Sequence, residues 1–224
     1  MVKQETNDLF LIMVGAHIFL AVIWIIFSVL HSLLASLSLK KKAALLLGAS
    51  FKYYRLFYTL FAFAILGAVA YYQIRLASPF LYNPTTATSV IGGAVALTGG
   101  IIMGICIKKY FISLSGLKSL FQELPFNQLM IQGIHRYVRH PLYLGTFIFI
   151  WGFFIAWPQL SLLIANFIIT TYTLIGIELE EQKLKAEFGK AYQDYQQQVP
   201  KLLPFRNLSS FRTVQRRKEG IHRF

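Results

Sequence analysis

Long uncharged apolar runs constrain this chain more than any other feature of its sequence. Residues 9–30 are interrupted only by His17 and Ser28, and a helix needs about 20 mostly apolar residues to cross a bilayer. Five runs of this kind follow one another, at residues 9–30, 56–74, 87–107, 142–157 and 160–177. Because 56% of the residues are hydrophobic, which is high for a soluble domain, the sequence predicts an all-α integral membrane bundle of five transmembrane helices.

The positions of the lysine and arginine residues predict how these spans are oriented. Twenty of the 22 basic residues lie after the first, third and fifth spans, and only Lys3 and Arg75 lie on the opposite side. The positive-inside rule places the basic segments in the cytosol. We therefore expect an outside N-terminus and a location in the bacterial inner (plasma) membrane. The first run is too long for a signal-peptide core and lacks a basic leader, so it is expected to remain as a span.

The last two spans are separated only by Trp157, Pro158 and Gln159, which predicts a tight helical hairpin. Helices joined by such a turn are antiparallel neighbours. Because the two runs are nearly equal in length, the start of the fourth span and the end of the fifth are expected to meet on the cytosolic side.

A helix and a basic tail are expected after the fifth span. Leu184, Phe188, Tyr192 and Tyr195 recur at helical spacing, which predicts an amphipathic cytosolic helix against the membrane face. Residues 206–224 contain six basic residues and one acid, which is typical of an arm that rests on anionic headgroups. The expected domains are one membrane domain over residues 1–205 and this tail over residues 206–224.

Several classes of site and partner are excluded by the residue counts. The single cysteine, Cys106, lies in an apolar run, so disulfides and cysteine-based zinc sites are not expected. His17 and His31 lie 14 residues apart, about 21 Å along a helix, and cannot ligate one haem iron. The net charge of +13 falls where a membrane surface would attract it. We expect the lipid bilayer as a partner, with no metal and no nucleic acid.

Two polar clusters lie at the cytosolic ends of the fourth and fifth spans. The first cluster comes directly before Pro141 and contains His135, Arg136, Tyr137, Arg139 and His140. Proline at a first helical position leaves free N–H groups and the positive end of the helix dipole beside this cluster. The second cluster contains Glu180 and Glu181. Together they predict a site for a polar ligand, with a surface pair between Glu181 and Lys185 as the alternative interpretation of Glu181.

These residues also resemble a known family. The pattern consists of Arg139-His140-Pro141-Leu142-Tyr143-Leu144-Gly145, Glu180-Glu181, Phe188-Gly189, Tyr192, Tyr195, Val199-Pro200 and Pro204. It resembles the membrane methyltransferase superfamily, which includes isoprenylcysteine carboxyl methyltransferases, phospholipid N-methyltransferases and methanethiol S-methyltransferases. The segments around His31 and Arg55 further resemble the branch that holds the methanethiol enzymes and NnrU-like proteins.

The resemblance implies S-adenosylmethionine as cofactor, held between the start of the fourth span and the end of the fifth. It implies catalytic roles for Arg139 and Glu181, and an acceptor path past His31 and Arg55. The implied cofactor-binding residues are Tyr137, His140, Pro141, Tyr143, Gly145, Glu180, Glu181 and Tyr192.

The acceptor is expected to be a small or membrane-partitioned molecule, and a thiol is the first choice. Prenylcysteine carboxylate is the second choice and a phospholipid amine the third. The prenylcysteine branch carries an arginine shortly before its acidic pair, whereas residues 174–177 here are Leu-Ile-Gly-Ile. Methyl transfer needs alignment and exclusion of water more than acid–base help. The alternative of another class is a membrane scaffold or permease without enzymatic activity.

Overall fold

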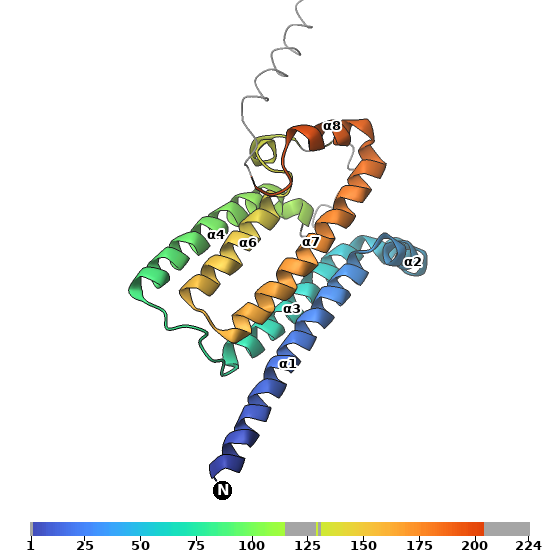
Figure 1. Cartoon of the computed structure of the whole chain (residues 1–224). Helices are drawn as coiled ribbons and strands as arrows, with labels where there is room; N and C mark the ends of the chain where they lie inside the picture. The colour runs from blue at the N-terminus through green and yellow to red at the C-terminus, as the bar shows by residue number, and fades with distance from the viewer. Residues whose placement is uncertain (1, 115–128, 130, 204–224) are drawn as a thin grey trace, which may run out of the picture.

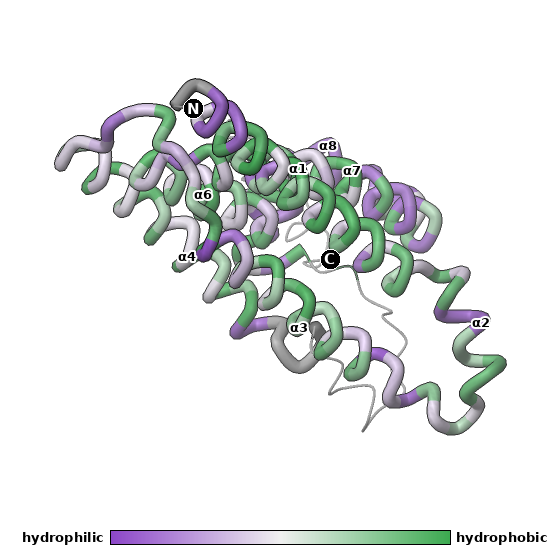
Figure 2. The backbone as a smooth tube through the Cα atoms, turned by 90° about the horizontal axis from the view of Figure 1, so that it is seen from below, coloured by the Kyte–Doolittle hydropathy of each residue, from purple (hydrophilic) through white to green (hydrophobic). Residues whose placement is uncertain are grey.

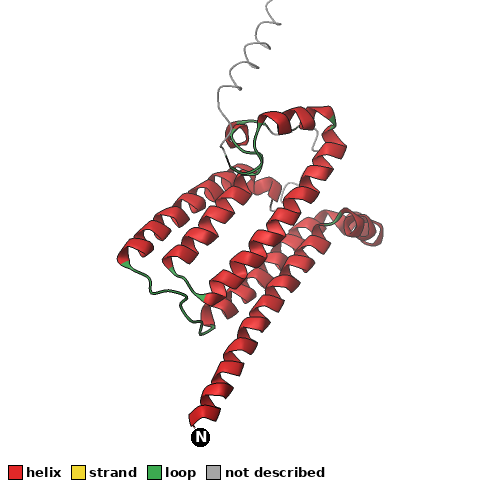
Figure 3. Cartoon of the chain, in the orientation of Figure 1, coloured by secondary structure: helices red, strands yellow, loops and turns green. Residues whose placement is uncertain are grey.

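The computed structural model describes residues 2–114, 129 and 131–203. Its elements are α1 (Val2–Ala35), α2 (Leu37–Leu47), η1 (Gly48–Tyr53), α3 (Tyr54–Arg75), α4 (Thr86–Leu114), η2 (Gly133–Arg136), α6 (Pro141–Ala156), α7 (Leu160–Phe188) and α8 (Lys190–Gln198). Apart from an isolated bridge between Phe80 and Gln159, the regular structure in these ranges is helical (Figure 3). The expected all-α fold is confirmed for the described part. The predicted tail at residues 206–224 lies outside it.

Four helical segments in the described part are long and apolar enough to cross a membrane. They are Gln4–Ala35, Leu37–Arg75, Thr86–Lys109 and Leu160–Phe188. Large apolar side chains along them are exposed, including Leu11 at 65% and Phe63 at 67%, as expected where lipid takes the place of water. Figure 2 shows α1 hydrophilic near its N-terminus and hydrophobic along its middle. Helix α6 is apolar but has only 16 residues, so the fifth span stays a prediction.

The helix bounds agree closely with the expected spans, with two differences. Helix α2 was not expected; it is short and begins after Ser36, whose hydroxyl accepts a hydrogen bond from the Leu39 amide at 3.3 Å. The second difference concerns the end of the fifth span, because α7 continues as one helix to Phe188. Gly189 then adopts a φ of 53°, a conformation that suits glycine, and separates α7 from α8. The expected amphipathic helix is therefore divided between two elements.

Helices α4 and α6 pack closely because glycines face the partner backbone. A Cβ atom on Gly92 would lie 2.4 Å from the Ala156 nitrogen, and one on Gly99 would lie 2.3 Å from the Phe149 nitrogen. On α6, a Cβ atom on Gly152 would lie 2.5 Å from the Ala96 nitrogen. Small residues are the usual means of close helix approach in membranes. The small-residue pair that the sequence suggests is a different one: a Cβ atom on Gly104 would meet nothing within 4 Å.

The second half of the bundle consists of α1, α3 and α7. Leu20, Trp24, Val69 and Ala165 form its buried apolar core. The Trp24 indole donates a hydrogen bond of 2.8 Å to the side chain of Gln73, which satisfies its N–H group inside the bundle.

The hairpin of α6 and α7 joins the two halves. The Asn166 side chain donates to the Ile150 carbonyl at 2.9 Å, and the Trp151 indole donates to the Thr170 hydroxyl at 3.1 Å. The N-terminus and the loops after α3 and α6 lie at one end of the molecule, and α2 and α8 lie at the other (Figure 1). The two polar clusters therefore share an end with the lysines of α2.

Candidate active site

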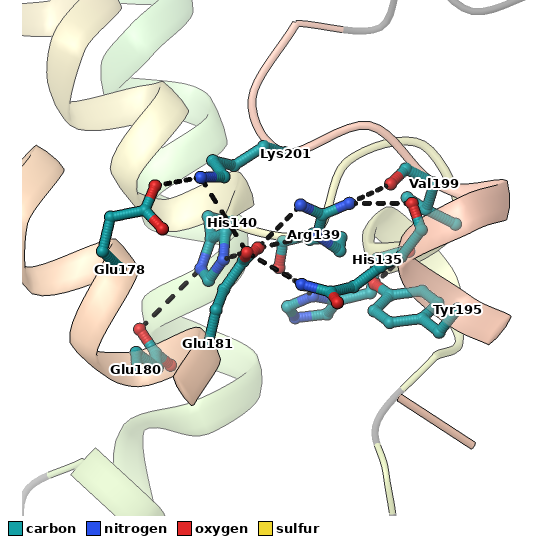
Figure 4. A network of polar contacts seen from close by, with 10 residues as sticks. His135, Arg139, His140, Glu178, Glu180, Glu181, Tyr195, Val199 and Lys201 are labelled. Atoms are coloured by element: carbon teal, nitrogen blue, oxygen red, sulfur yellow. Dashed lines mark hydrogen bonds and ion pairs between the residues drawn. The ribbon is translucent and has the colours of Figure 1, made fainter. Parts of the chain in front are cut away.

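The candidate site forms where the start of α6, the last turns of α7 and the segment after α8 meet (Figure 4). His140 is the N-cap residue of α6, and Pro141 is its first helical residue. The uninterrupted α7 carries the acidic side chains beyond its apolar part. The expectation that the two polar clusters meet is confirmed, because Arg139 and His140 both contact Glu181.

The Glu181 carboxylate is the centre of a buried polar network. Its side chain is 4% exposed. One oxygen accepts from Arg139 Nε at 2.8 Å and lies 2.8 Å from Arg139 Nη2. The other oxygen accepts from the Gln196 amide at 2.9 Å. A buried carboxylate needs such partners to offset its lost hydration. The alternative of a surface pair with Lys185 is therefore wrong.

The same carboxylate fixes the orientation of His140. His140 Nε2 lies 3.1 Å from Glu181 Oε1. Because a carboxylate only accepts hydrogen bonds, Nε2 carries the proton. The other ring nitrogen, Nδ1, lies 3.7 Å from Glu180 Oε2, which is too long for a hydrogen bond. The ring of Tyr143 stacks on His140, with centroids 5.7 Å apart and planes at 24°.

Arg139 also attaches the end of α8 to the site. Its Nη1 donates to the carbonyl oxygens of Gln196 at 3.1 Å and Val199 at 2.6 Å. The backbone amides of Arg139 and His140 donate to Pro200 and Lys201 at 2.9 and 3.1 Å. These two amides are therefore engaged by the protein. The first-turn amides of Leu142 and Tyr143 are left for other partners, since His140 makes no side-chain cap.

Tyrosines of α8 hold the loop before α6. The Tyr195 hydroxyl donates to the His135 carbonyl at 2.7 Å. The imidazole of His135 donates through Nδ1 to the Arg139 carbonyl at 3.1 Å. Burial lowers the pKa of His135, so its ring is neutral at neutral pH. The loop and α8 thus support Arg139 from both sides.

Two buried polar atoms beside this network have no hydrogen-bond partner in the described part. They are the hydroxyl oxygen of Tyr192 and the Oε2 atom of Glu180. Tyr192 is 1% exposed, and burial, together with the nearby Glu181 charge, raises its pKa, so the hydroxyl keeps its proton. Unpaired buried polar atoms are costly, and such atoms in a candidate site are typical of groups that a ligand satisfies.

The remaining predicted site residues lie in other surroundings. Gly145 faces α4, because a Cβ atom there would lie 3.0 Å from side-chain atoms of Ile102 and Met103. Tyr137 is 57% exposed and, within the described part, takes no part in the network. His31 and Arg55 lie on α1 and α3, and their roles in an acceptor path stay predictions, as do the catalytic roles of Arg139 and Glu181.

Sequence reasoning missed several partners in this network. Gln196 and Lys201 both approach Glu181; Lys201 Nζ lies 3.9 Å from its Oε2 atom and also pairs with Glu178. The carbonyl groups of residues 199–201 were missed as well, although Val199-Pro200 belongs to the recognised pattern. A proline after a helix indicates where the chain turns, and that is the only signal the sequence offers.

Comparisons with known proteins agree with this picture. The phospholipid methyltransferase family model matches residues 87–191. A methanethiol S-methyltransferase of Crocosphaera subtropica is 37% identical over 89 residues, which cover 38% of this chain and 33% of that protein. One of Pseudomonas sp. (strain GM41(2012)) is 42% identical over 76 residues, covering 33% of this chain and 28% of that protein.

A more distant similarity is to the protein-S-isoprenylcysteine O-methyltransferase of Schizosaccharomyces pombe, 34% identical over 84 residues, covering 34% of this chain and 33% of that protein. No solved structure matches the chain. The matched part spans about a third of the length of the curated relatives. The predicted resemblance to the membrane methyltransferase superfamily, on its methanethiol S-methyltransferase branch, is thereby confirmed.

Proposed function

We propose that this protein is an integral membrane methyltransferase that uses S-adenosylmethionine and methylates a thiol. The observation that carries the proposal is the pair of unpartnered buried atoms, Glu180 Oε2 and Tyr192 Oη, beside a fixed Arg139–Glu181 pair. The family match covers α6 and α7 up to residue 191. A rigid polar frame with unsatisfied groups at its edge suits a ligand rather than a scaffold contact.

The residues at this edge fit the polar groups of S-adenosylmethionine. The Glu180 carboxylate suits its ammonium or ribose hydroxyls. The first-turn amides of Leu142 and Tyr143 suit its carboxylate, and the stacked rings of His140 and Tyr143 offer a flat surface to its heterocycle. The bound cofactor supplies a methyl group activated by a positively charged sulfur.

Arg139 and Glu181, for which the resemblance implies catalytic roles, act in this proposal by positioning other groups. Their hydrogen bonds are made to each other, to His140 and to the end of α8. These bonds hold His140 and the residues after α8 in one geometry. Methyl transfer depends on alignment of the acceptor with the methyl group, so loss of this frame reduces the rate without removing a reacting atom.

A thiol is proposed as acceptor because two of the relatives are named as methanethiol S-methyltransferases. Prenylcysteine carboxylate is the second candidate, from the similarity to the enzyme of Schizosaccharomyces pombe. Helix α6 serves as the fifth span in this proposal. Its 16 residues give about 24 Å of helix, and its close packing on α4 shields part of its surface. The N-terminus is then outside and the site faces the cytosol of a bacterial inner membrane.

Binding and acceptor use test the proposal together. Calorimetry on the purified protein should detect binding of S-adenosylhomocysteine. Labelled S-adenosylmethionine should then be supplied with a short alkyl thiol, a farnesylated cysteine and phosphatidylethanolamine, each in a separate reaction. Label in the thioether is the expected result. Label in the farnesylated product alone would overturn the thiol assignment, and no binding of S-adenosylhomocysteine would favour a scaffold or permease.

A further inference from the structure

A second polar cluster lies inside the bundle, on helices that the network around Glu181 does not use. His31 and Ser32 of α1 meet Tyr58 of α3 and Tyr172 of α7. The Tyr58 hydroxyl lies 3.0 Å from His31 Nε2 and 3.2 Å from His31 Nδ1. The Ser32 hydroxyl donates to the Tyr172 hydroxyl at 3.3 Å, and the ring of Tyr172 meets His31 edge-on with centroids 6.3 Å apart. Polar groups within membrane helices are costly and are often functional.

The other histidine of α1 shows what a purely structural histidine looks like in this bundle. His17 is 5% exposed. Its two ring nitrogens have separate partners, the Met13 carbonyl at 2.7 Å and the Ser78 hydroxyl at 2.9 Å. Both nitrogens of His31, in contrast, approach one hydroxyl group. Since that hydroxyl can bond only one of them well, His31 retains one nitrogen that can accept a proton.

An apolar groove leads from the lipid-facing surface to this cluster. It has a volume of about 540 Å³ and lies between α1 and α7. Ile25, Val29 and Phe167 contribute to its apolar walls, while Ser32 and Tyr172 line it at the polar cluster. A groove with these walls suits an alkyl chain, and its two hydroxyl-bearing residues suit a small polar head. An alkyl thiol that has dissolved in the membrane has this chemistry.

Tyr143 connects the two polar regions. Its hydroxyl lies within electrostatic range of Glu180 and also of Tyr172 and Tyr58. Tyr143 stands in the first turn of α6, and its ring stacks on His140. A cofactor held at Glu180 and Tyr143 is therefore adjacent to the cluster in which the groove ends.

We infer that His31 is the proton acceptor for a thiol bound in the α1–α7 groove, and that Tyr58 orients its ring. This inference rests on the proposed function. In the step, a lone pair of the thiol sulfur forms the bond to the methyl carbon. The bond between that carbon and the cofactor sulfur breaks, its electron pair stays on that sulfur, and the thiol proton passes to His31. The products are a methyl thioether, S-adenosylhomocysteine and protonated His31.

The test compares two acceptors that differ in acidity. An alkyl thiol is protonated at neutral pH and needs a base, whereas an aromatic thiol is largely ionised and does not. For His31→Gln we expect a loss of about a hundredfold or more in the rate with the alkyl thiol, and a loss of less than about threefold with the aromatic thiol. Affinity for S-adenosylhomocysteine, measured by calorimetry, should stay within about twofold of the wild type.

Matched variants keep the test interpretable. His17→Gln alters the other histidine of α1 and should affect both acceptors equally. Tyr58→Phe keeps the ring and removes the hydroxyl, and should slow the alkyl thiol more than the aromatic one; it carries the test if His31→Gln does not fold. Equal losses with both acceptors for His31→Gln or Tyr58→Phe, or an unchanged alkyl-thiol rate, would overturn the inference. A wild-type protein that binds S-adenosylhomocysteine but methylates neither thiol also overturns it while leaving the cofactor assignment intact. Absence of that binding removes the proposed function itself.

Discussion

Replacing Glu181 by glutamine should destabilise the protein, because its carboxylate is the buried counter-ion of Arg139. The two side chains are 4% and 9% exposed, so water cannot hydrate the guanidinium group that the substitution leaves unpaired. Removing one partner of a buried pair typically costs about 3–5 kcal/mol. For a chain of this length, each kcal/mol lowers the melting temperature by about 2–4 °C. The expected decrease is therefore about 6–20 °C.

Glu178→Gln is the matched control for this measurement. Glu178 stands three residues earlier on α7 and pairs with Lys201, but its side chain is 60% exposed. A surface pair contributes about 0–1 kcal/mol, so this variant should melt within about 4 °C of the wild type. Melting followed by tryptophan fluorescence in one detergent gives the comparison. If Glu181→Gln melted as high as Glu178→Gln, the buried network would not be the support that we infer.

Three further predictions concern other parts of the structure. Glu180→Gln should weaken binding of S-adenosylhomocysteine about ten- to a hundredfold without lowering the melting temperature, because it removes a charge-assisted hydrogen bond to the ligand only; calorimetry checks this. Gly99→Ala should destabilise the protein by about 1–3 kcal/mol, since its Cβ atom would lie 2.3 Å from a backbone nitrogen of α6, whereas Gly93→Ala, with nothing within 4 Å, should not; thermal melts of the two variants decide. Burial lowers the pKa of His135 from 6.5, so the unfolded chain takes up this proton first; stability should decrease as the pH falls below about 6.5, and less so in His135→Gln, in melts at pH 7.5 and 5.5.

The spans could be predicted because hydropathy and length determine them directly. The sequence places the third span at residues 87–107, and α4 runs over Thr86–Leu114. Rotation of the helices was not predictable in the same way. A helix that is apolar on all sides gives no moment that says which face meets a neighbour. For this reason the sequence suggested Gly100 and Gly104 as a packing pair, whereas Gly92 and Gly99 make the close contact with α6.

The approach of the two polar clusters was predictable from the hairpin, but the division of roles within them was not. Spacing along the chain shows that Arg139 and Glu181 come near each other. It does not show that Glu181 is buried or that Gln196 returns to bond it. That contact depends on the turn at Gly189, where a positive φ redirects the chain. A local pattern predicts such a turn less reliably than it predicts a helix.

The division of roles in the site follows from which hydrogen bonds the protein already makes. Arg139 and Glu181 carry the strongest charges, yet these charges are spent on each other and on the end of α8. A ligand that took either partner would have to break a buried ion pair, at a cost comparable to the affinity it could gain. Glu180 and Tyr192 present polar atoms that have no such partner, so binding them requires no bond to be broken. The groups that recognise the ligand are therefore expected beside the charged pair, and the pair itself is expected to hold them in place.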